Sequence, residues 1–323
     1  MTSTTTTVHR LRLRPNQLSV GPDGLTHSPH LGWATRRGRA GLFFVLPLFV
    51  LYLLFMLTPV GYAIYTSLFK TTLVGGTHFA GLANYANTLT SSVFWHSMGR
   101  VMLFAVVQVP ITLILATFFA VLFDVGLTRY GRVLRMLFFL PFTVPAVVAA
   151  VMWSYLLEPQ FGPFSRLAST LGFHGANYFS PNLILPTIIV IVIWEVTGWN
   201  MIVLYTALKA VPDSVMEAAA MDGASLRRAI IQVKLPMVRP AIVKLLFLNT
   251  IGALQLFTEP MMLATFQPQA VSYGFTPTVY IYNTAVSSNE YNLAAAAAVL
   301  FALLILVMSV TSLLFRRRLA GLA

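Results

Sequence analysis

The chain has 323 residues, of which 57% are hydrophobic and only 9% are charged, and its formal net charge is +12. Soluble domains carry about 25% charged residues, so this composition excludes a water-soluble globular protein. Several apolar runs reach the roughly 20 residues that a helix needs to cross a bilayer, which predicts a polytopic membrane protein. Cysteine is absent, and this excludes disulfides, thiolate metal sites and a cysteine nucleophile.

The first 35 residues are polar and are predicted to form a disordered cytoplasmic tail, because they cannot bury enough apolar surface to offset their ordering entropy. A basic cluster at 36–39 then precedes an apolar run at 41–68. This run is too long for a signal peptide and lacks a small-residue cleavage site, so it is predicted to be the first transmembrane helix. Pro47 and Pro59 lie inside it and are expected to bend it.

Further apolar runs predict transmembrane helices at 98–123, 133–157, 182–208, 240–263 and 293–315. The chain is therefore predicted to be all-α, with six transmembrane helices in a domain that spans 36–318 and a short C-terminal tail at 319–323.

Most lysines and arginines lie in the N-terminal tail, the 124–132 loop, the 209–244 region and the C-terminus, whereas the opposite loops carry Lys70, Arg100 and Arg166. Retention of positive charge in the cytoplasm then places both termini inside. The basic residues thus reflect membrane topology, and no nucleic-acid partner is expected. The outer loops are too short to form a domain, so capture of a ligand outside the membrane requires another protein.

The longest hydrophilic stretch in the second half of the chain is the 212–240 segment. Ser214 and Glu217 form an S-x-x-E capping box, which predicts a helix beginning near Ser214. Gly223 is expected to end or bend this helix, Ser225 to cap a second one, and Leu235-Pro236 to end the second. The segment is therefore predicted to be a short helix–turn–helix at the cytoplasmic face. A plain amphipathic loop at the membrane surface is the alternative interpretation.

The pattern E-A-A, three residues, Gly, nine residues, an aliphatic residue, any residue and Leu-Pro resembles the signature loop of permease subunits of bacterial ATP-binding-cassette (ABC) importers. Val233 stands where the family often has isoleucine. In that family the loop inserts into a groove on the ATPase subunit. The resemblance implies ATPase contact by Glu217, Ala218, Ala219, Asp222, Gly223, Arg227, Leu235 and Pro236.

Other stretches are similar to the carbohydrate, maltose-type branch of these permeases. The 159–163 stretch resembles an outer P-x-x-G motif, and 256–263 resembles L-F-x-E-P-Y-x-L. The Gly-Gly-Gly-Pro that usually follows is replaced by 264–269, while 280–282 and 294–298 fit the last span. The resemblance implies translocation of a sugar or sugar-like solute.

The resemblance also implies partners in a bacterial cytoplasmic membrane: a second, related permease subunit, two ATPase subunits that bind ATP and magnesium, and an extracytoplasmic solute-binding protein or lipoprotein. The chain itself contains no G-x-x-x-x-G-K-[ST] phosphate loop, so it is not expected to bind or hydrolyse ATP. All histidines fall in the tail or the outer loops with no metal-ligand spacing, which argues against an enzyme and a metal site.

Two carboxylates, Glu195 and Glu259, fall within the predicted spans, where charged groups are costly and tend to face the bundle interior or a wet cavity. They predict a solute path whose polar groups hydrogen-bond sugar hydroxyls while a tryptophan stacks on a sugar face. The predicted path residues are Glu195, Trp199, Asn200, Asn249, Gln255 and Glu259. The alternative is that these side chains, like Gln108 and Trp153, only hold helices together, or that Glu259 lies at the outer boundary.

Two other functions stay open at this point. A self-contained secondary carrier or channel would need coupling-ion sites, usually in broken helices of repeated halves, and the sequence shows no such repeat. A membrane-anchored scaffold would tolerate the loss of Glu195 and Glu259.

Overall fold

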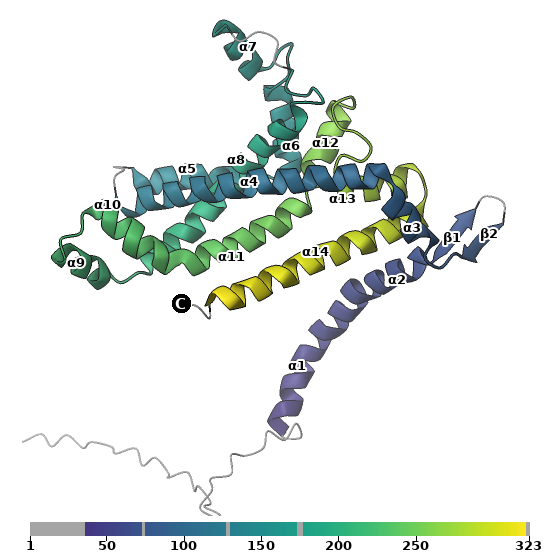
Figure 1. Ribbon diagram of the computed structural model, residues 1–323, viewed down its shortest axis with the longest axis horizontal. Helices are drawn as coiled ribbons and strands as arrows, with labels where there is room; N and C mark the ends of the chain where they lie inside the picture. The colour runs from purple at the N-terminus through teal and green to yellow at the C-terminus, as the bar shows by residue number, and fades with distance from the viewer. Residues whose placement is uncertain (1–35, 73–74, 127–129, 173–176, 321–323) are drawn as a thin grey trace, which may run out of the picture. The chain divides into compact units, whose positions relative to one another are not determined.

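A computed structural model describes residues 36–72, 75–126, 130–172 and 177–320, and the predicted disordered tail at 1–35 lies outside these ranges. The chain divides into two compact units, one ending at Val60 and one beginning at Gly61. Helices long and apolar enough to cross a membrane number five among the described residues, or up to six if a bent pair counts as one span. The prediction of a helical, polytopic membrane protein is confirmed (Figure 1).

The first unit is a helix that departs from α geometry just before a proline. The helix α1 (Arg36–Tyr52) runs into the π-helical turn η1 (Leu53–Leu57) and then into α2 (Thr58–Ser67), which continues into the second unit. Pro59 has no N–H to donate, and the Leu53 carbonyl instead accepts from both the N–H and the hydroxyl of Thr58. Every side chain from 43 to 60 is exposed.

The predicted outer loop at 69–97 contains regular structure that the sequence reasoning missed. Strands β1 (Phe69–Thr72) and β2 (Gly76–Phe79) pair antiparallel, with Phe69 opposite Phe79, and helix α3 (Ala83–Thr90) follows. The Asn84 side chain donates to the carbonyls of Ser67 and Phe69 at 2.8 and 2.7 Å, which ties the hairpin to α3. Strands of four residues give too little alternation to be seen in a sequence.

The core of the second unit is built on two long helices, α4 (Ser92–Asp124) and α8 (Ile184–Lys209), which pack side by side. Small residues on α4, such as Ala116 and Ala120, are fully buried and allow close approach. At Gly198 in α8, an added Cβ would lie 1.8 Å from the carbonyl oxygen of Phe138, so only glycine lets the neighbouring backbone cross here.

The third predicted span, 133–157, is not one continuous helix. It consists of α5 (Gly131–Thr143) and α6 (Ala146–Leu156), which meet at an angle of 98°. Val144 adopts an extended conformation with ψ of 125° because it precedes Pro145, and α6 begins directly after that proline. The short helix α7 (Pro163–Thr170) follows in the next loop.

The 212–240 segment begins as predicted but ends differently. Helix α9 (Asp213–Met221) starts within one residue of the predicted position, yet its N-cap is Pro212 and no side chain caps it, so the predicted capping box is wrong. The second helix, α10 (Leu226–Ala229), does begin after Ser225, although the Ser225 side chain makes no capping hydrogen bond.

The predicted helix end at Leu235-Pro236 is also wrong. Helix α10 passes through the π-helical turn η2 (Ile230–Lys234) directly into α11 (Leu235–Leu254). Leu235 keeps helical dihedrals of −64° and −43° although a proline follows, and its N–H donates to the Ile230 carbonyl five residues earlier. The π-helical turn thus precedes Pro236 as η1 precedes Pro59, and it lets the helix continue past a residue without an N–H.

The span is interrupted at 255–257 before α12 (Thr258–Phe266). The chain then forms the short helix α13 (Pro277–Tyr282) and the π-helical turn η3 (Asn283–Ser287), and ends in α14 (Tyr291–Ala320). In Figure 1, α4, α8 and α11 extend toward the same end of the second unit as α9 and α10.

We expect Gly198→Ala to lower the free energy of unfolding by about 1–3 kcal/mol, because the new methyl group must displace the Phe138 backbone. The matched control is Gly99→Ala in α4, where an added Cβ meets nothing within 4 Å and stability should be unchanged or slightly higher. Denaturation of the purified protein in detergent measures both. Equal loss in the two variants would contradict the close packing at Gly198.

Candidate functional site

The residues predicted to form a solute path meet in one cavity of about 370 Å³, called the polar cavity below. It is lined by parts of α4, α5, α8, α11, α12 and the 255–257 interruption. Every predicted path residue contributes to its wall, namely Glu195, Trp199, Asn200, Asn249, Gln255 and Glu259. Helices distant in sequence thus place these groups together, while their role toward a solute stays a prediction.

A pair of asparagines holds two walls of the polar cavity together. Asn200 of α8 donates to the side-chain oxygen of Asn249 of α11 at 3.1 Å, and Asn249 donates back at 2.7 Å. Each amide also donates to the carbonyl four residues earlier in its own helix. This reciprocal pairing is what the alternative interpretation, adhesion between helices, expects for these two side chains.

Glu195 differs from the asparagines, because part of its carboxyl group has no partner. Its side chain is buried, with 7% of the residue exposed, and its Oε1 atom makes no hydrogen bond within the described residues. The carboxyl group of Glu259 in α12 interacts with it electrostatically and through a side-chain hydrogen bond. Burial and this neighbouring carboxyl group set Glu195 apart from the paired asparagines, while its contact with a solute stays a prediction.

An aromatic pair forms another wall. Trp199 stacks on Phe142 of α5 with ring centroids 5.0 Å apart and planes 18° apart, and 42% of Trp199 remains exposed. Phe142 was missed by the sequence reasoning, since nothing in its surroundings along the chain marks it. Gln108 of α4 also lines the polar cavity and donates to Thr112 at 2.8 Å. Its side chain thus belongs to the cavity wall, while the packing role considered for it stays a prediction.

The interruption at 255–257 exposes backbone to the polar cavity, and the freed groups find partners. The Leu256 carbonyl accepts from the hydroxyls of Thr276 and Thr278 at 2.9 and 2.5 Å. Non-helical backbone at membrane depth is tolerated where it is buried in protein or lines a cavity. Pro260 in the first turn of α12 was the sequence signal for a new helix start.

The turn in the 212–240 segment is a Schellman motif built on Gly223. Gly223 has a φ of +78°, its N–H donates to the Ala220 carbonyl, and the N–H of Ala224 donates to the Ala219 carbonyl, both at 3.0 Å. A positive φ is unfavourable for residues with a side chain, so the predicted helix break at Gly223 is confirmed with its cause.

The surface of this turn is only partly the one expected from the sequence. Glu217, Ala218, Asp222 and Gly223 are exposed, but Ala219 is buried against the rest of the chain. The most exposed large apolar side chain there belongs to Met221, at 88%, and the sequence reasoning did not single it out.

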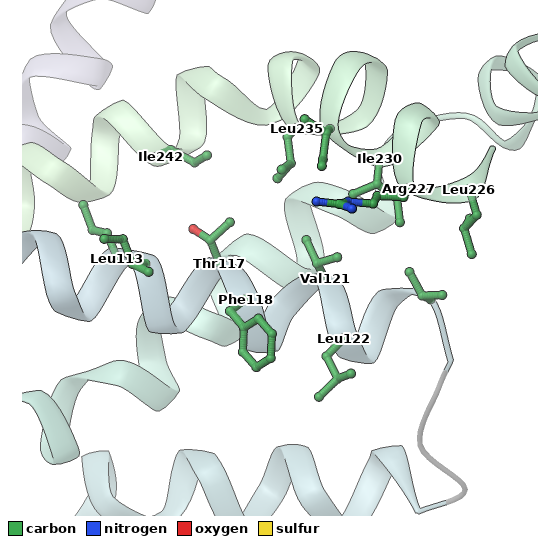
Figure 2. Close-up of a pocket in the computed structure, with 13 residues that line it drawn as sticks. Leu113, Thr117, Phe118, Val121, Leu122, Leu226, Arg227, Ile230, Leu235 and Ile242 are labelled. Carbon is green, nitrogen blue, oxygen red and sulfur yellow. The ribbon is translucent and has the colours of Figure 1, made fainter. Parts of the chain in front are cut away.

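Arg227 and Leu235 line an apolar groove of about 840 Å³ between α4 and the α10–η2–α11 stretch. Figure 2 shows this groove, with the Arg227 side chain directed into it from α10. Pro236 is exposed. Arg227 is exposed as well, whereas Leu235 is half-buried, and the contact of these residues with an ATPase stays a prediction.

Within the described ranges, no three His, Asp or Glu side chains lie close enough together to hold a metal ion. Residues 113–321 match the model of the family described as "Binding-protein-dependent transport system inner membrane component". The chain belongs to this family. The matched region includes the 212–240 segment and most of the polar cavity, and the resemblance to importer permeases inferred from the sequence is confirmed.

Curated relatives of this family are permeases. The chain is 28% identical to the "Trehalose/maltose transport system permease protein MalF" of Thermococcus litoralis, over 86% of this chain and 94% of the relative. It is 29% identical to the "Sulfoquinovosyl glycerol transport system permease protein SmoG" of Agrobacterium fabrum, over 82% and 86% of the two chains.

A solved structure shares the fold. A chain of the "bacterial alginate ABC transporter in complex with alginate pentasaccharide-bound periplasmic protein" superimposes with a TM-score of 0.76 at 21% identity, over 88% of this chain and 96% of that one. The fold is thus that of a membrane-spanning subunit of an ABC transporter.

The asparagine pair gives a prediction on stability. Asn200→Leu or Asn249→Leu alone should destabilise the protein, because each leaves one buried amide without its partner. The double variant should lose less than the sum of the two, by about 0.6 kcal/mol or more. A double-mutant cycle on unfolding in detergent–dodecyl sulfate mixtures measures this difference, and strict additivity would show that the two amides do not interact.

Proposed function

We propose that this chain is the permease subunit of an ATP-driven importer and that a sugar or sugar-like solute crosses the membrane through the polar cavity. The observation that carries the proposal is the gathering of the predicted path residues around one cavity of the second unit. The family assignment supports the transport function, and the cavity supports the class of solute.

The lining of the polar cavity suits a neutral solute rich in hydroxyl groups. It offers two carboxyl groups, amide groups and a half-exposed tryptophan face, and it includes no lysine, arginine or histidine. Carboxyl and amide oxygens accept hydrogen bonds from hydroxyls, so these groups can bind the hydroxyls of a sugar. The relative named above as a trehalose/maltose permease supports the same class of solute. Sulfoquinovosyl glycerol is a sugar derivative with a sulfonate group, so the second relative supports a sugar-like solute but not a neutral one.

The 212–240 segment is the proposed contact with an ATPase subunit, and the complex would contain two such subunits, which bind ATP and magnesium. Its exposed Glu217, Asp222 and Gly223 support this role, as does the absence of a phosphate-binding loop in the chain. The proposed complex contains a second, related permease and a solute-binding protein outside the membrane, as the solved alginate transporter has a periplasmic protein bound. Both termini of this chain would be cytoplasmic.

One observation favours a different mechanism, that of a self-contained secondary carrier. Broken helices that line a central site are typical of such carriers, and the 255–257 interruption is a break of this kind. The two mechanisms differ in their partner, because a secondary carrier needs no ATPase.

The proposed ATPase contact predicts that Glu217→Gln and Gly223→Val reduce co-purification of the ATPase subunit and solute uptake by about 10-fold or more, since charged contacts and turn geometry are both lost. Asp213→Asn is the matched control, an acidic residue of the same helix that lies outside the E-A-A-x-x-x-G pattern. Uptake into membrane vesicles and pull-down of the complex measure the effects. Normal uptake with both positions changed would refute the contact.

The proposed solute path predicts that Glu195→Gln reduces uptake by about 10-fold or more, because an amide cannot reproduce the hydrogen bonds that the carboxyl group makes to the solute. Assembly with the ATPase should be unaffected. Glu290→Gln, at an exposed position outside the polar cavity, serves as the control and should transport normally. A scaffold would show the same uptake for wild type and Glu195→Gln.

A further inference from the structure

A buried ionic cluster joins the 212–240 segment to the rest of the chain. Asp124 is the last residue of α4, and its carboxylate forms ion pairs with two lysines. Lys234, in η2, lies with its Nζ 2.5 Å from Oδ2, and Lys209, at the end of α8, lies with its Nζ 3.1 Å from Oδ1. Lys209 also donates to the backbone carbonyl of Asp124 at 3.2 Å.

The two lysines differ in burial. The side chains of Asp124 and Lys234 are only 4% and 11% exposed, whereas that of Lys209 is 53% exposed. A charge without a partner is costly in a buried position, and removing one partner of a buried pair is strongly unfavourable. The Asp124–Lys234 pair therefore resists separation, while Lys209 can exchange its partner for water.

The position of the Asp124–Lys234 pair along the chain determines which helices it can connect to the 212–240 segment. The segment is covalently continuous with α8 at one end and with α11 at the other, so any displacement of it acts directly on both helices. Helix α4 is the remaining long helix that lines the polar cavity, through Phe104 and Gln108, and it has no such continuity.

The apolar groove lies between α4 and the α10–η2–α11 stretch, so side chains do not fill the space between these elements there (Figure 2). The Asp124–Lys234 pair holds η2 to the end of α4 across that region. From Asp124 to Gln108 the helix extends for about 24 Å, at ~1.5 Å per residue, as one continuous element.

We propose that the Asp124–Lys234 pair couples displacement of the 212–240 segment to α4, so that all three long helices lining the polar cavity move together. Asp124 and Lys234 are then positioning residues for transport, and neither touches the solute. This inference rests on the proposed function. It adds to that function the two residues that transmit ATP-driven motion of the 212–240 segment to α4, a helix with no direct chain connection to this segment.

The experiment compares Asp124→Asn, Lys234→Gln and Lys209→Gln in the complete complex with its ATPase subunits and binding protein. The readout is the amount of solute imported per ATP hydrolysed, which a loss of protein stability alone does not change. We expect Asp124→Asn and Lys234→Gln to lower this ratio by about five-fold or more, with ATPase co-purification retained. Lys209→Gln, which removes the exposed partner of the same carboxylate, should stay within about two-fold of wild type.

A second measurement keeps the proposal testable if the single variants assemble poorly. The chain contains no cysteine, so Asp124→Cys with Lys234→Cys introduces the only thiols of this subunit. In a complex whose partner subunits lack cysteine, a short bis-methanethiosulfonate reagent should join the two positions and restore the ratio. Reduction should abolish the restored ratio, and each single cysteine variant is the control.

The outcomes separate this inference from the proposed function. An unchanged ratio in Asp124→Asn and Lys234→Gln, or a cross-linked pair that stays as inactive as the reduced one, would overturn the coupling role. Failure of the wild-type chain to co-purify with an ATPase would instead overturn the proposed function. A ratio lowered equally by Lys209→Gln would show that coupling does not depend on the buried Asp124–Lys234 pair in particular, and would overturn its assignment to that pair.

Discussion

Polar groups at membrane depth must find their partners inside the protein, because lipid tails offer none. The arrangement of the second unit follows from this constraint. Asn200 and Asn249 pair across two helices, and the Leu256 carbonyl, freed where the helix is interrupted, accepts two threonine hydroxyls. These bonds fix α8, α11 and the 255–257 interruption around one space, and the polar cavity is the result.

Glu195 is the informative departure from this rule. Its Oε1 atom is buried without a hydrogen-bond partner in a chain that satisfies comparable groups nearby. An open acceptor beside a second carboxyl group costs stability, and such a cost is retained where a ligand uses the group. The asparagines, in contrast, are satisfied by each other. The polar cavity thus contains both residues that hold helices together and a carboxyl group that we propose to serve the solute.

The same constraint acts at the other end of the long helices. Asp124 ends α4 in a buried position and is stable there because Lys234 and Lys209 neutralise it. Lys234 belongs to the segment proposed to contact the ATPase. The same ion pair that stabilises the buried Asp124 carboxylate therefore also joins this segment to α4, so that the two are proposed to move together. The Schellman turn at Gly223 and the buried Ala219 give that segment a fixed shape of its own.

The sequence by itself determined the membrane spans, the 212–240 segment and its break at Gly223, because these depend on hydropathy and backbone preferences within a few neighbouring residues. It also singled out six side chains that line the polar cavity, since polar side chains stand out in apolar runs. Only the tertiary structure decided that Asn200 meets Asn249, 49 residues away, and that Lys234 meets Asp124, 110 residues away. It likewise decided the 98° bend after α5 and the uninterrupted passage from α10 into α11. Such pairings arise from how whole helices pack, and no local pattern encodes which of several polar residues will face each other.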